Sequence, residues 1–202
     1  MEKFLAVGFG CFLASCTGVA DAQVYEGAAV VGGPQFDSAN AVVKDAAGNI
    51  FVGGSFMSSV DFDPGPAVNT RIAVGSSDAY LLKLSREGVF QQLWTWGTTA
   101  SESVDALAVD ESGNVYVGIT ASPGASVPYD TDPADAINSI GGLGGQDAFV
   151  VKLDAAGDHV AAVVGGGAGN DNVVALTSRD GFLVVAGRAA SGTAGFGGTT
   201  LA

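Results

Sequence analysis

The residues best suited to bind a ligand are four aspartates in two copies of one short motif. Asp61-Phe-Asp63-Pro recurs 69 positions later as Asp130-Thr-Asp132-Pro. Two carboxylates this close in a tight loop can point at one hard cation, and Ca²⁺ takes six to eight oxygen ligands. The motif lacks the further acidic ligands and the glycine of a recognised calcium loop. An aspartate can instead accept a backbone N–H in an Asx-turn that proline presets. We expect the turn, with a Ca²⁺ site at these four residues as the alternative.

Two other pairs of polar residues also recur at matching positions, and we expect structural roles for both. Asp78 and Asp147 each begin a D-A-[FY] segment. Their carboxylates are expected to accept backbone N–H groups of the preceding glycine turn. Lys83 and Lys152 interrupt apolar segments. Their stems can lie along a neighbouring sheet while the amine reaches water.

No set of residues predicts catalysis. His159 is the only histidine, and both cysteines lie near the N-terminus, so a zinc site of the usual spacing cannot be built. A Ser-His-Asp triad would lack the G-x-S-x-G turn that presents the serine. Trp94 and Trp96 lie two apart on one expected strand and face the same side. Core packing is the favoured role for them, and a sugar-stacking platform is the alternative.

An internal repeat organises the elements that carry these residues. Residues 38–54 (SANAVVKDAAGNIFVGG) align with residues 103–119 (SVDALAVDESGNVYVGI) at an offset of 65. Residues 61–88 align with residues 130–157 at an offset of 69, which places a four-residue insertion in the loop between the two segments. A third, diverged copy begins near Asn172. Self-similarity at this period indicates a repeat architecture.

Each repeat contains four short apolar segments separated by turn residues. In the second copy they are ALAVD, NVYVGIT, DAFVVKLD and HVAAVVGG. Short segments rich in valine and aromatic residues, bounded by Gly, Asn and Asp, predict strands. FVVKL and YLLKL do not alternate apolar with polar residues, so both faces of the sheet are expected to be buried. The sequence predicts an all-β fold of β-propeller blades with four antiparallel strands each. The expected blades span about 38–97, 103–166 and, truncated, 172–202, or about 2.5 blades; a single-sheet meander or a sandwich is the alternative.

The motifs G-N-[IV]-[FY]-V-G, D-F-D-P-G and D-A-[FY]-x-x-K-L-x-x-x-G recur in order. Together they resemble the bacterial β-propeller repeat family (SBBP type) of exported and cell-surface proteins. The resemblance covers roughly residues 30–200, although the third copy has Gly195-Phe196-Gly197 where D-x-D is expected. It implies the fold and export but no reaction, since propellers support unrelated functions.

The N-terminal segment predicts export. Residues 1–22 have the pattern of a signal peptide, with Lys3 ahead of an apolar stretch too short to anchor in a bilayer. Cleavage after Ala22 is one expectation. The other is a lipoprotein signal ending at Ser15, with lipidation of Cys16. The protein is thus expected in the periplasm, anchored to the outer membrane or outside a bacterial cell.

The charge balance narrows the possible partners. Eight basic residues against 21 acidic ones give a net charge of −13, which disfavours nucleic acid. We expect a non-catalytic binding or scaffold module without a cofactor, whose partner is a protein or a glycan. A lipid anchor would be its only link to a membrane. Because an open propeller leaves a sheet face uncovered, self-association or missing blades are expected to close it. A fragment of a propeller enzyme with a central active site and a calcium-stabilised scaffold are the alternatives.

Overall fold

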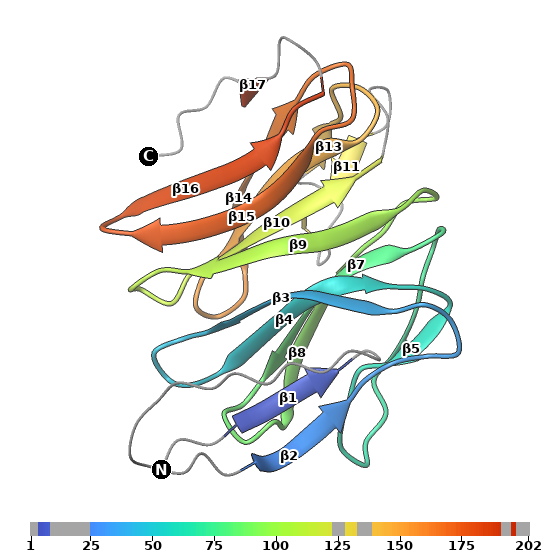
Figure 1. Cartoon of the computed structure of the whole chain (residues 1–202), viewed down its shortest axis with the longest axis vertical. Coiled ribbons are helices and arrows are strands. Elements are labelled where there is room, and N and C mark those ends of the chain that lie inside the picture. Colours follow the sequence, from blue (N-terminus) through green and yellow to red (C-terminus); the bar gives the residue numbers. More distant parts are fainter. Residues whose placement is uncertain (1–3, 9–24, 123–127, 133–138, 191–194, 197–202) are drawn as a thin grey trace.

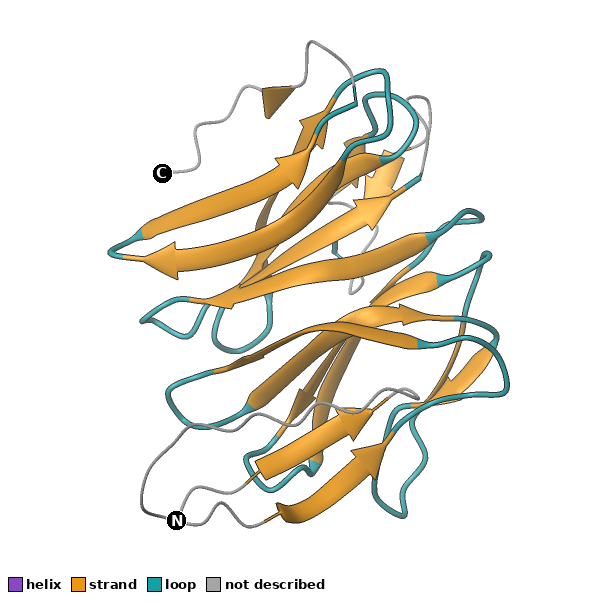
Figure 2. Ribbon diagram, in the orientation of Figure 1, coloured by secondary structure: helices purple, strands orange, loops and turns teal. Residues whose placement is uncertain are grey.

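The computed structural model describes residues 4–8, 25–122, 128–132, 139–190 and 195–196. Within these ranges the regular secondary structure is all strand (Figure 2). None of the described residues belongs to a helix of the length and apolarity that a membrane span requires. The predicted all-β class is therefore confirmed.

Two four-stranded antiparallel sheets form the body of the molecule. The first sheet has the order β3-β4-β7-β8, and the second has β14-β13-β10-β9 with the two-residue strand β17 beside β14. The first sheet comprises β3 (Ser38–Lys44), β4 (Ile50–Phe56), β7 (Asp78–Leu84) and β8 (Phe90–Trp96). The second comprises β9 (Glu102–Val109), β10 (Val115–Ala121), β13 (Asp147–Leu153), β14 (His159–Gly166) and β17 (Gly195–Phe196).

Smaller pairs of strands accompany the two sheets. The hairpin of β15 (Asn172–Arg179) and β16 (Phe182–Arg188) follows the second sheet. The hairpins β5 (Ser59–Asp61) with β6 (Thr70–Ile72) and β11 (Pro128–Asp130) with β12 (Ser139–Gly141) interrupt the second-to-third strand connection of each sheet.

The first described strand lies within the predicted signal peptide. β1 (Phe4–Gly8) pairs in parallel with β2 (Tyr25–Val30). Export and the choice of processing site stay predictions, and Cys16 and Ala22 lie outside the described residues.

The sheets repeat each other residue by residue, as the alignment predicts. Phe51 pairs with Lys83 across β4 and β7, and the equivalent Tyr116 pairs with Lys152 across β10 and β13. The strands of the sheets run in sequence order, and each sheet is open at both edges in the described residues. These meanders match the predicted four-strand units, whereas their arrangement as propeller blades stays a prediction.

The layers stack face to face from the first sheet through the second sheet to the β15–β16 hairpin (Figure 1). One hydrophobic cluster fills the space between the sheets and includes Leu81 and Trp96 from the first sheet and Val117 and Phe149 from the second. A second cluster covers the opposite face of the first sheet, and a third lies between the second sheet and the hairpin. In β7 and β13, six of the seven residues are buried. The prediction that these strands are buried on both faces is confirmed.

Candidate functional site

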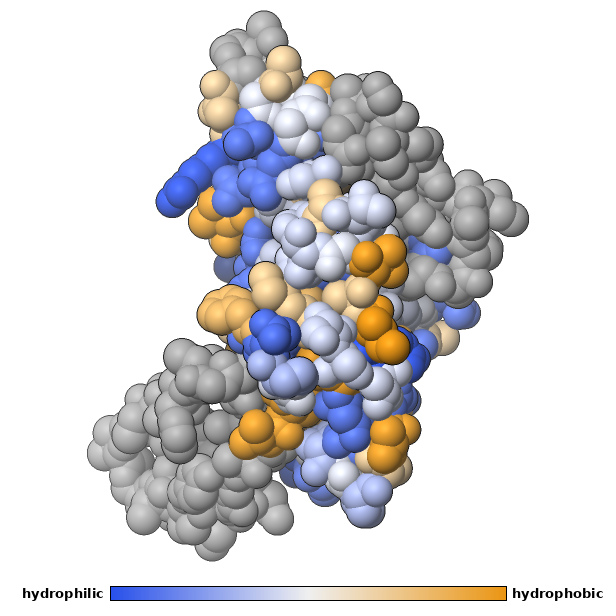
Figure 3. Space-filling model, turned by 90° about the vertical axis from the view of Figure 1, so that its right-hand side faces the viewer, coloured by the Kyte–Doolittle hydropathy of each residue, from blue (hydrophilic) through white to orange (hydrophobic). Residues whose placement is uncertain are grey.

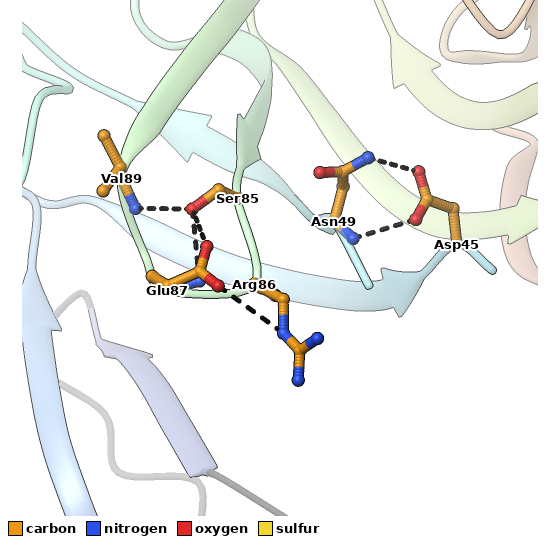
Figure 4. Close-up of polar contacts among 6 residues, drawn as sticks. All are labelled: Asp45, Asn49, Ser85, Arg86, Glu87 and Val89. Atoms are coloured by element: carbon orange, nitrogen blue, oxygen red, sulfur yellow. Dashed lines mark hydrogen bonds and ion pairs between the residues drawn. The ribbon is translucent and has the colours of Figure 1, made fainter. Parts of the chain in front are cut away.

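Tight turns join the strands at one end of the sheets. Asp45 begins the β3–β4 turn, where its carboxylate accepts hydrogen bonds from the backbone N–H and the side-chain amide of Asn49, both at 2.8 Å (Figure 4). Asp110 and Asn114 form the same contacts in the second sheet, at 2.9 and 2.7 Å. Gly48, like its counterpart in the second turn, has a positive φ, which an L-residue adopts only with strain. This end is built from short turns whose polar groups form hydrogen bonds within the turn.

The pKa of Asp110 shows how completely such a turn satisfies its carboxylate. Partial burial by itself would raise this pKa. Hydrogen bonds donated by Asn114, Tyr116 and Ser112 outweigh the burial and hold the pKa of Asp110 below its usual value.

The opposite end carries the longer connections and a row of buried carboxylates. Asp78 is 3 % exposed, and its carboxylate accepts N–H groups of Val74 at 3.0 Å and Gly75 at 3.4 Å. Asp147 is fully buried and accepts N–H groups of Leu143 at 2.9 Å and Gly144 at 3.3 Å. The prediction that both aspartates anchor the preceding glycine turn is confirmed.

Three further carboxylates at this end are missing from the sequence prediction. Asp37, Glu102 and Asp171 lie at the start of the first strand of each unit. Each accepts the N–H of the residue four positions earlier, at 2.7–2.8 Å. The repeat alignment carries the signal for them, because an offset of 65 superposes Asp37 on Glu102, and an offset of 69 from the second copy to the third superposes Glu102 on Asp171. The match was easy to miss because the second copy has a glutamate where the first and third copies have an aspartate.

The first junction between layers brings two of these carboxylates together. Glu102 is 1 % exposed and lies beside Asp78, because the backbone N–H of Glu102 donates to the carbonyl of Ser77 at 2.9 Å. Burial raises the pKa of Glu102, hydrogen bonds from Thr98 lower it, and the negative charge of Asp78 raises it further. Burial likewise raises the pKa of Asp78 against the hydrogen bonds from Val74 and Gly75.

The second junction repeats this pairing with Asp147 and Asp171. The backbone N–H of Asp171 donates to the carbonyl of Gln146 at 2.7 Å, so the two aspartates lie at adjacent strand starts. A Cβ on Gly166 would lie 2.7 Å from Asp147 Oδ1 and 2.8 Å from Asp171 Oδ2. The two carboxylates therefore face each other across this glycine, and two buried like charges are costly unless something neutralises them.

The predicted calcium motif forms a turn where the structure describes it. Asp61 Oδ1 accepts N–H groups of Asp63 at 3.1 Å and Asn69 at 2.8 Å, and Asp63 Oδ1 accepts that of Gly65 at 2.7 Å. These are the contacts of the expected Asx-turns. Asp132 is 9 % exposed, whereas the side chain of Asp130 lies outside the described part.

Among the described residues, no three His, Cys, Asp or Glu side chains are grouped so that they could hold a metal ion. The calcium site at the two D-x-D-P motifs stays a prediction.

The ammonium groups of the matched lysines lie over aromatic rings of their own sheet. Lys83 Nζ is 5.3 Å from the centre of the Phe51 ring, and Lys152 Nζ is 5.4 Å from that of Tyr116. The cause is the shared register, which places each lysine opposite an aromatic residue on the adjacent strand. The cation–π contact in both copies supports a structural role.

Trp94 and Trp96 are core residues that join the two sheets. They are 7 % and 2 % exposed. Their indole N–H groups donate to the carbonyls of Gly157 at 3.0 Å and Thr131 at 3.1 Å. Buried rings cannot stack on a sugar, so the alternative of a sugar platform on these tryptophans is wrong.

His159 is half-buried, with Nε2 3.3 Å from the hydroxyl of Thr131. It thereby joins the start of β14 to the loop that follows β11.

The comparisons with known proteins add no assignment. No family model matches the chain, and no curated protein is significantly similar to it.

Proposed function

We propose that the chain is a non-catalytic, exported binding or scaffold module whose sheets are blades of the β-propeller type. The repeated stacking carries the proposal: two sheets with the same strand order and register lie face to face, and both their central strands are buried. Blades of a propeller have these properties, because each is covered by its neighbours.

A protein partner fits the exposed surface better than a glycan does. Both tryptophans are internal, whereas the outer face of the β15–β16 hairpin exposes Val174, Phe182 and Val184 at 49 %, 68 % and 58 %. On the side of the molecule drawn in Figure 3, small apolar groups alternate with polar ones. The inner face of the hairpin already packs on the second sheet through Leu176, Leu183 and Val185. The outer face is suited to receive another sheet of the same type, from a second copy or from further repeats.

Size-exclusion chromatography with light scattering on the full chain tests this proposal. We expect self-association that Phe182→Glu reduces, because a buried charge at the centre of the contact is costly. Val68→Glu is the matched control, because Val68 is 76 % exposed and lies in the loop between β5 and β6. A stable wild-type monomer that does not bind hydrophobic dye would contradict the uncovered face. Hydrolase or lyase turnover abolished by a point substitution would contradict the non-catalytic role.

A further inference from the structure

The second junction differs from the first in one respect that points to a ligand. Asp147 Oδ1 is buried and has no hydrogen-bond partner, whereas Asp147 Oδ2 accepts the N–H groups of its glycine turn. The bare oxygen lies on the side of Gly166 and Asp171. Leaving a buried acceptor without a donor is destabilising, and more so when the acceptor is charged. A proton, a water molecule or a cation bound to this oxygen would remove the cost.

At the first junction the matching aspartate has donors for both oxygens, because the N–H of Val74 lies 3.1 Å from Asp78 Oδ1 and 3.0 Å from Asp78 Oδ2. Glu102 reaches one methylene further than Asp171, and its Oε1 accepts a hydrogen bond from the hydroxyl of Thr98 at 2.6 Å. In the second junction the position of Thr98 is taken by Gly167, which has no hydroxyl. The second junction therefore differs from the first in an unpartnered carboxylate oxygen and in the missing threonine hydroxyl.

In the part of the chain that the structure describes, neither Asp147 nor Asp171 forms an ion pair with a Lys or Arg side chain. The oxygens of Asp171 accept backbone N–H groups, Oδ2 that of Gly167 at 2.7 Å and Oδ1 that of Ala190 at 2.8 Å. Among the described residues, the ion pairs involving Lys or Arg are made elsewhere, at Arg86 with Glu87 and at Arg179 with Asp180. Hard oxygen ligands of net negative charge are the donor set that Ca²⁺ prefers.

We propose that Asp147 and Asp171 hold one Ca²⁺-class cation at the junction between the second sheet and the β15–β16 hairpin. Asp147 Oδ1 and Asp171 Oδ2 are its carboxylate ligands. The other ligands come from water and from carbonyls of the glycine-rich segments before Asp147 and Asp171. Because Asp147 belongs to the sheet and Asp171 begins the hairpin, the cation fastens one layer to the next. This site is separate from the D-x-D-P motifs.

The test is calcium binding and thermal unfolding of the full chain, first stripped of metal with a chelator. We expect isothermal titration to give one CaCl₂ site per chain that depends on this pair. The melting temperature should rise by about 5–10 °C when free Ca²⁺ exceeds its Kd a hundredfold. Asp171→Asn should remove the rise. Asp61→Asn and Glu102→Gln, at the sequence-predicted motif and at the first junction, should leave it intact.

Asp147→Asn separates the proposal from a general loss of structure. The amide oxygen of the asparagine can still accept the N–H groups of Leu143 and Gly144. Its NH₂ group takes the place of the unpartnered Asp147 Oδ1 and can donate a hydrogen bond to Asp171. The metal-free variant should melt no lower than the metal-free wild type, and it should not respond to Ca²⁺.

Three results would overturn the site. One is the absence of any effect of millimolar Ca²⁺ on the wild type. Another is a response that both Asp147→Asn and Asp171→Asn retain. The third is a Ca²⁺ response that Asp61→Asn or Glu102→Gln abolishes.

Discussion

Gly54 is the position at which adding one carbon tests the arrangement of the first sheet most directly. A Cβ there would meet the carbonyl oxygen of Ser38 on the neighbouring strand β3, and it would also lie 3.0 Å from Cε1 of Tyr80. The clash is with backbone on one side and with a fully buried ring on the other, so neither neighbour can turn away. Gly54→Ala should therefore force β3 away from β4.

The two repeats explain why glycine is needed in one and not in the other. Gly54 pairs with Tyr80 across β4 and β7, and Ile119 pairs with Phe149 at the equivalent place in the second sheet. The Tyr80 hydroxyl donates to the carbonyl of Ser38 at 3.0 Å. Phe149 has no hydroxyl, so its strand partner can carry a large side chain. The glycine accommodates a hydrogen bond that only the first sheet makes.

The expected cost of Gly54→Ala combines two contributions. Overpacking at a well-packed position costs about 1–3 kcal/mol. Loss of the bond between Tyr80 and Ser38 adds about 1 kcal/mol. The sum, about 2–4 kcal/mol, corresponds to a melting temperature lower by roughly 4–16 °C for a chain of this size.

Thermal unfolding followed by circular dichroism measures this change. Gly141→Ala is the matched control, because a Cβ on Gly141 meets nothing within 4 Å, and it should alter the free energy of unfolding by at most about 0.5 kcal/mol. Tyr80→Phe should cost only the hydrogen bond, about 1 kcal/mol. If Gly54→Ala has the same melting temperature as the wild type, the close approach of β3 to β4 is refuted.

Three further outcomes follow from the buried polar groups and the tryptophans. Because burial raises the pKa of Glu102 above its unfolded value, the stability that this group contributes is present at low pH and is lost as the pH rises through the folded pKa. Glu102→Gln should thus flatten the decline in melting temperature as the pH rises above the usual glutamate pKa of 4.5, and an unchanged profile would contradict the assignment. The pKa of Asp110 is lowered, so its contribution is present at neutral pH and is lost as the pH falls through the folded pKa; Asp110→Ala should cost about 1–2 kcal/mol at pH 7 and progressively less in acid, as urea titrations would show. Trp96→Phe removes the indole donor and leaves a gap between the sheets, so it should cost about 2–4 kcal/mol, and a neutral result would place this ring outside the core.

The strands, turns and repeat boundaries could be predicted from the sequence because their causes are local. Glycine at a positive φ and an aspartate that accepts the N–H four residues later define the turns at Asp45 and Asp110. Uninterrupted apolar segments require two buried faces wherever the strand lies. Asp78 and Asp147 were assigned correctly for the same reason, since the N–H groups they accept are three and four residues away.

The partners of long side chains depended on the tertiary structure. The expectation that the lysine stems lie along a neighbouring sheet stays a prediction, whereas the register between strands places the ammonium groups of Lys83 and Lys152 over rings of their own sheet. The tryptophans left two roles open in the sequence, since strand alternation says that they share a face and not what covers that face. The packing of the second sheet on β8 decided the matter by burying both.

The sequence by itself determined that the chain is all-β, repeated and acidic, and that one strand in each of the two repeats, β7 and β13, is buried on both faces. Composition, repeat period and hydrophobic pattern determine these features, and all three can be read from the order of the residues. Only the tertiary structure decided which carboxylates meet. Asp78 and Glu102 belong to different sheets, and Asp147 and Asp171 belong to a sheet and a hairpin, so each pair exists only when one layer stacks on the next. Stacking also buries these carboxylates, whereas the same acids in water would be ordinary surface charges.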